Sequence, residues 1–174
     1  MEAVTLSEAR VYVGTYNKYN SGSLFGKWLD LSDYSDKDEF LEACADLHKD
    51  EQDPEYMFQD YENIPETLFS ESSLSEKFFE LRDATENMDE TVQEAFFIWC
   101  EDANKDFNKE DADSLVSAFT NDYIGQYDSE EDYAEEYIRE TQDLSDFVLQ
   151  YFNYATDLFC SGYWFKDGFV FYRS

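Results

Sequence analysis

The sequence is poor in basic residues, histidine and glycine, and these shortages exclude several functions. Among 174 residues there are 12 Lys and Arg against 42 Asp and Glu, so the net charge at pH 7 is −30. A chain of this charge is repelled by phosphates, which excludes direct binding to nucleic acid. The one glycine-rich stretch, NSGSLFG at 20–26, lacks a P-loop lysine and the spacing of a dinucleotide-binding loop. We therefore expect no nucleotide cofactor.

Histidine and cysteine are too few for most metal and nucleophilic sites. His48 is the only histidine, and we interpret it as a helix C-terminal residue favoured by the helix dipole. Cys44, Cys100 and Cys160 lie too far apart for a zinc knuckle, and their odd number does not fit a disulfide framework. We expect reduced cysteines in the core. Because no pair among the 42 carboxylates stands out, glycoside hydrolysis has no candidate residues either. We expect a protein that is not an enzyme.

Long apolar runs are also absent. No stretch approaches the length of a transmembrane helix, and the N-terminus carries acids where a signal peptide needs a basic region. These features predict a cytoplasmic protein that makes no contact with membranes.

One spacing is similar to that of a calcium-binding loop. Residues 102–113 place side-chain oxygens at the positions of an EF-hand, but Phe107 stands where the turn needs glycine. Asp113 also replaces the glutamate that binds calcium through both oxygens. We therefore interpret the segment as a polar connection between helices and predict no metal site.

The sequence has ample material for folded cores, since 43% of its residues are hydrophobic and 19% aromatic. A compact globule of this length would have a radius of gyration of about 16 Å, which crowds the excess charge together. An elongated chain of α+β class lowers that repulsion. Local periodicity predicts strands at 10–16 and 27–31, loops at 17–26 and 50–62, helices at 38–48, within 74–106, at 112–120 and at 128–143, and a hairpin turning at Asp167 and Gly168.

The acids are densest at 30–66, where fourteen Asp and Glu stand against two Lys. Aromatic and aliphatic residues between them indicate a folded scaffold instead of a disordered tail. Solubility alone needs a net charge of about 2–8, and like charges one helical turn apart cost about 0.2–0.5 kcal/mol per pair. Duplex DNA carries one charge per about 1.7 Å, so thirty charges correspond to about 50 Å of duplex. The acids therefore indicate an imitation of DNA.

The acids that we expect to replace phosphates lie on the predicted helices at 38–48 and 128–143, on the 50–62 loop, and just before them. They are Asp30, Asp33, Asp38, Glu39, Glu42, Asp46, Asp50, Glu51, Asp53, Glu55, Asp60, Glu62, Asp128, Glu130, Glu131, Asp132, Glu135, Glu136, Glu140 and Asp143. An alternative function is that of an acidic adaptor or chaperone for another basic DNA-binding protein or nuclease. A purely solubilising surface is the simplest competing interpretation.

Three blocks of the sequence resemble the ArdA antirestriction family. They are YVGTYNKYNSGSLFGKWLDL at 12–31, DPEYMFQDYE at 53–62, and YFNYATDLF at 151–159, which precedes the aromatic hairpin. The resemblance implies a DNA mimic, encoded on mobile elements such as conjugative plasmids, that fills the DNA-binding groove of type I restriction-modification enzymes. The implied partner is the methyltransferase core of such an enzyme.

The resemblance also implies an elongated, curved α+β chain of three small domains. In this sequence they would be an N-terminal α+β domain at 1–63, a helical domain at 64–108 and a C-terminal α+β domain at 109–174 that forms a homodimer. The antirestriction motif near the dimer contact would comprise Tyr151, Tyr154, Asp157 and Leu158. In this chain only Ala155 and Thr156 separate the second tyrosine from the Asp-Leu pair, where the family has additional residues.

Overall fold

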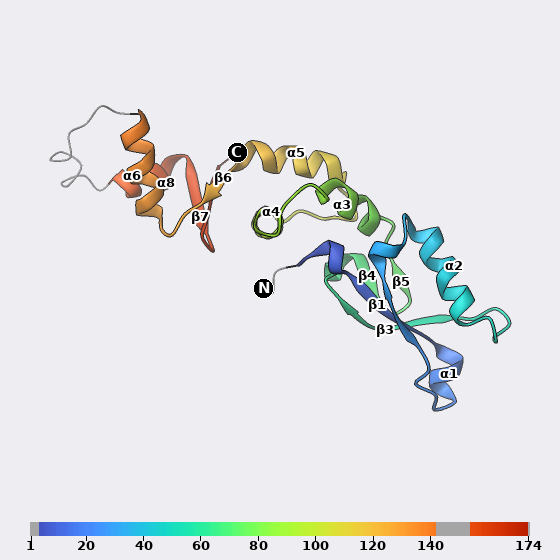
Figure 1. Cartoon of the computed structure of the whole chain (residues 1–174). Helices are drawn as coiled ribbons and strands as arrows, with labels where there is room; N and C mark the ends of the chain where they lie inside the picture. Colours follow the sequence, from blue (N-terminus) through green and yellow to red (C-terminus); the bar gives the residue numbers. More distant parts are fainter. Residues whose placement is uncertain (1–3, 142–153, 174) are drawn as a thin grey trace. The chain divides into compact units, whose positions relative to one another are not determined.

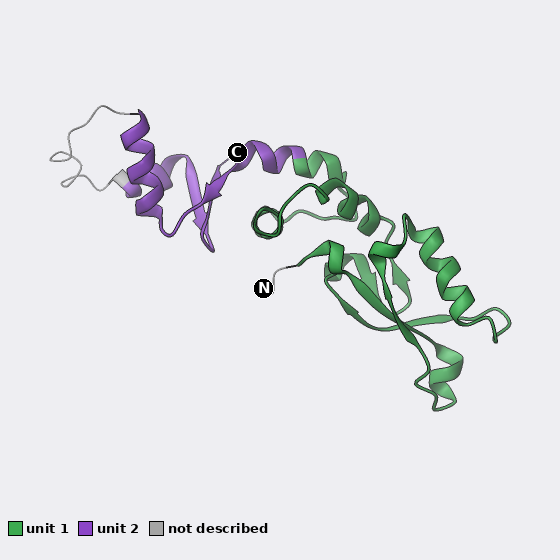
Figure 2. Cartoon of the chain, viewed as in Figure 1, with its two compact units in different colours: residues 1–116 green, residues 117–174 purple. Residues whose placement is uncertain are grey.

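The computed structural model describes residues 4–141 and 154–173 (Figure 1). The contacts group the chain into two compact units, residues 1–116 and 117–174 (Figure 2). Each unit combines helices with a three-stranded antiparallel sheet, so the predicted α+β class is confirmed. The division into three domains stays a prediction.

The first sheet consists of β1 (Arg10–Thr15), β2 (Lys27–Asp30) and β3 (Tyr56–Glu62), in the order β2-β1-β3. Val11 and Val13 alternate with outward residues along β1 and are fully buried, as the period of two predicts. The strands expected at 10–16 and 27–31 are therefore confirmed.

Two predicted loops contain regular structure, and the prediction is wrong there. Residues 56–62 of the 50–62 loop form β3, whose pairing with β1 shifts register between Tyr12 and Val13. The acids along β3 and this irregularity hide its alternation, since only Phe58 is buried. The start of the 17–26 loop belongs to α1 (Tyr16–Asn20), whose N-terminus is capped by the Thr15 hydroxyl.

The predicted helix at 38–48 is α2 (Lys37–Leu47). The Asp36 carboxylate accepts a hydrogen bond of 2.9 Å from the Glu39 N–H, which satisfies a free donor of the first turn. Phe40 and Cys44 lie one turn apart on its buried face, and the Phe40 ring packs 5.7 Å from that of Phe58 on β3. A short 3-10 turn, η1 (Leu6–Glu8), precedes β1, and a second one, η2 (Leu31–Asp33), follows β2.

The rest of the first unit is mainly helical, as the 3.6-residue period at 74–106 predicts. A turn, η3 (Glu66–Leu68), and a two-stranded hairpin of β4 (Phe69–Ser70) and β5 (Ser73–Leu74) lead into α3 (Lys77–Thr85) and α4 (Glu90–Asp102). Phe78 of α3 and Phe96 of α4 are fully buried.

Polar side chains connect these helices to the N-terminal segments. The Arg82 guanidinium of α3 donates hydrogen bonds to the backbone carbonyls of Leu31 (2.8 Å), Tyr34 (2.7 Å) and Ser35 (3.2 Å). The Gln93 side chain of α4 accepts a bond of 3.0 Å from the Leu6 N–H. These contacts explain why residues 1–116 form one compact unit.

The second unit begins within α5 (Ala112–Asp122) and continues through β6 (Tyr123–Gln126), α6 (Glu130–Thr141), α8 (Tyr154–Ser161), β7 (Tyr163–Lys166) and β8 (Phe169–Tyr172). The sheet order is β6-β8-β7, and β6 is a strand that the sequence analysis did not predict. Asp167 and Gly168 both have positive φ, 51° and 90°, which confirms the predicted two-residue hairpin turn.

The core of the second unit lies between its helices and its sheet. Tyr133 and Ala134 of α6 pack with Phe159 of α8 and Val170 of β8. The Tyr133 ring lies 5.4 Å from that of Tyr163, and burial is the main cause that raises the pKa of the Tyr163 hydroxyl. The predicted helices at 112–120 and 128–143 are confirmed over most of their length.

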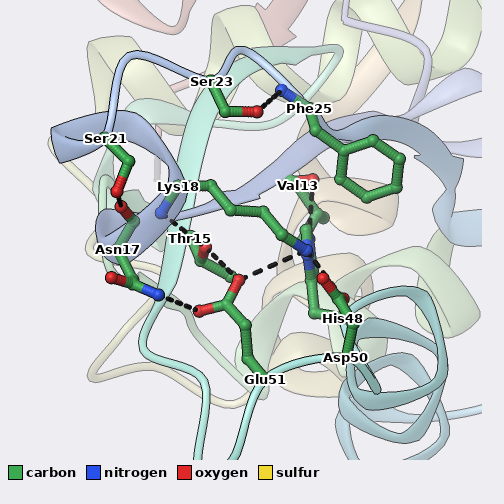
Figure 3. Close-up of polar contacts among 10 residues, drawn as sticks. All are labelled: Val13, Thr15, Asn17, Lys18, Ser21, Ser23, Phe25, His48, Asp50 and Glu51. Carbon is green, nitrogen blue, oxygen red and sulfur yellow. Dashed lines mark hydrogen bonds and ion pairs between the residues drawn. The ribbon is translucent and has the colours of Figure 1, made fainter.

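His48 ends α2 and is completely buried beneath the α1 region (Figure 3). Its Nδ1 lies 3.0 Å from the Lys18 Nζ, and its Nε2 lies 3.2 Å from the Val13 carbonyl oxygen. Because an ammonium only donates, Nδ1 accepts and Nε2 carries the proton. His48 is thus the C-terminal residue of α2, as predicted, and both of its ring nitrogens have polar partners within the fold.

The same lysine is held by two carboxylates. Lys18 Nζ lies 2.8 Å from Asp50 and 3.2 Å from Glu51, and its side chain is only 14% exposed. Glu51 also accepts hydrogen bonds from the Thr15 hydroxyl (2.7 Å) and the Asn17 amide (3.2 Å). These hydrogen bonds lower the pKa of the Glu51 carboxyl, and the bond from Thr15 has the largest effect.

We predict that Arg82→Met lowers the free energy of unfolding by about 1.5–3 kcal/mol, because it leaves three backbone carbonyls without their charged donor. Urea denaturation followed by circular dichroism measures the change. Lys49→Met is the matched control: it removes only a surface pair with Asp46, both side chains being at least 77% exposed, and should change stability by less than about 1 kcal/mol. Equal effects of the two substitutions would contradict this assignment.

We predict that Glu51→Gln destabilises the protein at pH 7 and that the difference from wild type shrinks as the solution is acidified. The folded-state pKa of Glu51 is lowered, so its stabilisation is present above the unfolded value of about 4.3 and is lost as pH falls through the folded value. Urea denaturation at pH 7, 5 and 3.5 measures this trend. Glu55→Gln controls for relief of repulsion, because Glu55 forms no ion pair with another described residue. A pH-independent difference would refute the prediction.

Candidate functional site

The acids of α2 lie on the side of the helix that faces solvent. Asp38, Glu42 and Asp46 follow one another at intervals of four residues and are exposed, while Phe40 and Cys44 are buried on the other side. Residues four apart stand above one another on a helix, so the three carboxylates form a row with a repeat of about 6 Å.

The acids of α6 are packed more densely. The helix reads EEDYAEEYIRET over 12 residues, which is about 18 Å of axis, so it carries about one acid per 3 Å. Asp132, Glu136 and Glu140 form an exposed row, while Tyr133 and Ala134 are buried. One strand of DNA carries a phosphate per about 3.4 Å of axis. The linear charge density of this helix thus approaches that of a nucleic-acid strand.

The acids of the 50–62 segment lie at the edge of the first sheet. Asp60 and Glu62 are exposed on β3, and Glu62 forms a two-point ion pair with Arg10, with distances of 2.8 and 3.0 Å. This pair lowers the pKa of the Glu62 carboxyl. Asp50 and Glu51 precede the strand and hold Lys18, as described above.

Within the predicted set, only some acids have a cation at ion-pair distance. These are Asp46, Asp50, Glu51, Glu62 and Glu135. Among residues 4–141 and 154–173, the following acids of the set form no ion pair with another described residue: Asp30, Asp33, Asp38, Glu39, Glu42, Asp53, Glu55, Asp60, Asp128, Glu130, Glu131, Asp132, Glu136 and Glu140. Of these, Glu130 alone is half-buried and the others are exposed. Asp143 lies outside the described residues.

Some exposed acids were absent from the predicted set. Glu86, Asp89 and Glu90 lie where α3 leads into α4, and the Asp89 carboxylate caps α4 by accepting from the Val92 N–H at 2.9 Å. The acidic character of 67–110 was visible in the sequence, but it did not distinguish capping acids from those available to a partner.

The segment at 102–113 uses its oxygens internally. Asp106 binds the Lys109 ammonium at 2.6 Å and the Asn108 N–H at 3.0 Å, and these bonds lower the pKa of its carboxyl. Glu110 binds Lys105 at 3.3 Å and the Asp106 N–H at 3.1 Å. In the part of the chain that the structure describes, no group of three or more His, Cys, Asp or Glu is placed to hold a metal ion. The contacts favour the polar helix connection.

The cysteines do not share one environment. Cys44 and Cys100 are buried, and burial raises the pKa of both thiols, that of Cys44 to about 12. Cys160 is exposed on α8, so the prediction that all three belong to the core is wrong for this residue. The last turn of α8 is amphipathic, and Phe159 takes the buried position beside Cys160.

The predicted antirestriction motif is only partly described. Tyr151 lies outside the described residues, whereas Tyr154, Asp157 and Leu158 are positions of α8. Leu158 is half-buried and packs against the core of the second unit. The dimer contact stays a prediction.

No helix within the described residues is long and apolar enough to cross a bilayer.

Comparison with known proteins identifies the family of the chain. No curated protein sequence matches the chain. The family model described as antirestriction protein (ArdA) matches residues 11–171. This match includes the acidic helices α2 and α6 and all three sheets, apart from Arg10 at the start of β1 and Tyr172 at the end of β8. Because it covers nearly the whole chain, this protein belongs to the ArdA family of antirestriction proteins.

Proposed function

We propose that this protein is a DNA mimic that occupies the DNA-binding groove of type I restriction-modification enzymes, with their methyltransferase core as its partner. The observation that carries the proposal is the charge of α6, which has about one acid per 3 Å of axis and presents Asp132, Glu136 and Glu140 in an exposed row. A groove lined with Lys and Arg for phosphates would meet carboxylates at a similar spacing.

The inhibition would need no catalysis. The chain belongs to an inhibitor family, and the carboxylates described above would act by charge and position. Since a protein surface offers no base edges, recognition would depend on the spacing of charges and the shape of the scaffold. The energy would be distributed over many similar contacts, each of modest strength.

Homodimer formation through the C-terminal unit would double the length of this surface. It rests on the resemblance of residues 151–159 to the antirestriction motif. The unpaired carboxylates of α2 and α6 are compatible with a binding surface on both units.

Competition with DNA tests the proposal directly. A purified type I methyltransferase methylates unmodified target duplex while this protein is titrated in at several DNA concentrations. We expect inhibition that excess DNA relieves, because both ligands would occupy one groove. Inhibition that DNA does not relieve would contradict the mimicry. Absence of inhibition by folded protein in large molar excess would favour an acidic adaptor for another basic protein.

Neutralising the exposed row of α6 tests the charge mechanism. We predict that Asp132→Asn combined with Glu136→Gln and Glu140→Gln weakens binding to the methyltransferase strongly and lowers the slope of log Kd against log salt concentration by about 2 to 3. Glu140→Gln alone should weaken binding by no more than about fivefold. Fluorescence titrations at several salt concentrations measure both quantities.

Circular dichroism and urea denaturation control for loss of fold in these variants. A single carboxylate substitution that abolishes inhibition in a folded protein would contradict distributed binding. A dissociation constant that does not change with salt would contradict the electrostatic mechanism as a whole.

A further inference from the structure

The segment between Ala9 and Leu29 differs from the rest of the chain because it contains no acid in 21 consecutive residues, although the whole chain holds 42. Three of the four large hydrophobic residues described as exposed lie within it: Leu24 is 73% exposed, Tyr19 51% and Phe25 50%. They belong to α1 and the loop after it, at the far end of the first sheet from α3 and α4 (Figure 1). We call these three residues the apolar tip.

The loop that carries the tip is held in a defined conformation. The Tyr12 hydroxyl donates to the Leu24 carbonyl at 3.1 Å, and the Ser23 hydroxyl accepts from the Phe25 N–H at 3.2 Å. Gly26 lies so close to β1 that a Cβ would stand 2.6 Å from the Tyr12 ring. The exposure of Leu24 is therefore a property of a fixed loop, not of a fraying one.

Phe25 packs on Lys18 and on the buried His48 ring (Figure 3). The Lys18 ammonium lies 4.5 Å from the centre of the Phe25 ring, and the His48 ring lies 5.7 Å away at a steep angle. One side of the ring is thus supported while half of the residue stays in solvent. Because Asp50 and Glu51 already bind Lys18, this cation is not available to a partner.

Phe25 of the tip and the helix α1 lie next to the acidic segment at 50–62, since Lys18 contacts both the Phe25 ring and Asp50. The Tyr16 N–H at the start of α1 donates to the Glu55 carbonyl at 3.1 Å, and Lys18 of the same helix binds Asp50. A partner that binds the exposed acids at 50–62 would therefore lie beside the tip. The tip offers no negative charge to a groove that binds phosphates. An apolar protein surface at the margin of that groove could bury the tip instead.

We propose that Tyr19, Leu24 and Phe25 anchor the inhibitor to an uncharged apolar surface of the target enzyme at the edge of its DNA groove. This inference rests on the proposed function and adds a contact that DNA itself does not make. The anchor would let the enzyme bind the inhibitor in preference to DNA, because apolar burial adds to affinity without needing phosphate sites.

Apolar contacts and ion pairs respond differently to salt, and this difference provides the test. Binding of Leu24→Ser to a purified type I methyltransferase is compared with that of wild type at several salt concentrations. We expect Kd to rise by about tenfold to a hundredfold at every salt concentration, with an unchanged slope of log Kd against log salt. Leu24→Met, which keeps the apolar volume, should retain wild-type affinity.

Two further measurements make each outcome decisive. Leu24 is 73% exposed, so Leu24→Ser should unfold at the same urea concentration as wild type. Tyr19→Ser provides a second, independent removal of tip surface and should weaken binding in the same salt-independent way. Phe25 is not substituted, because its ring packs on His48 and Lys18.

Unchanged affinity of both Leu24→Ser and Tyr19→Ser would overturn the anchor. If wild type were still displaced by excess DNA in that case, the proposed mimicry would stand without it. A changed salt slope would also overturn the anchor, because it would assign the tip to the charged contacts. If the substitutions changed only self-association in sedimentation, the tip would instead bind a second copy of this chain.

Discussion

Repulsion between carboxylates limits how this chain can fold. A net charge of −30 on 174 residues opposes any compact state, so each element must bury one side efficiently and turn its acids outward. The helices α2 and α6 do this at helical spacing, with Phe40 and Tyr133 inside and rows of acids outside. The cores are aromatic because large rings bury much apolar area from few positions.

Two of the few basic residues, Arg82 and Lys18, form contacts within the fold. Arg82 and Lys18 have side chains only 15% and 14% exposed, and each connects segments that are distant in the sequence. Arg82 satisfies backbone carbonyls near η2, whereas Lys18 joins α1 to His48 and to the acids after α2. Because these basic residues act within the fold, most acids of α2 and α6 form no ion pair with another described residue. A strongly negative surface is thus compatible with a stable interior.

The two kinds of exposed surface have different physical chemistry. Carboxylate rows attract a basic groove over a distance that the salt concentration determines, and this attraction would raise the rate of association. An apolar tip acts only in contact and is insensitive to salt. A competitor that combined both surfaces could resemble DNA in its electrostatic field and also make an apolar contact with the enzyme that DNA does not make. The tip is held by the hydrogen bond from Tyr12 to the Leu24 carbonyl and by the packing of Phe25 on Lys18.

The class of fold, the helices α2 to α6 and the hairpin at Asp167 and Gly168 could be predicted from the sequence, because helical periodicity and turn residues are local signals. The sequence also determined the sign and density of the surface charge. The strands at 56–62 and 123–126 could not be predicted in this way, since they pair with partners far along the chain. Likewise, only folding placed Lys18 against His48, thirty residues away, and left Leu24 exposed on a fixed loop. Such contacts arise from long-range packing, which no local pattern of residues specifies.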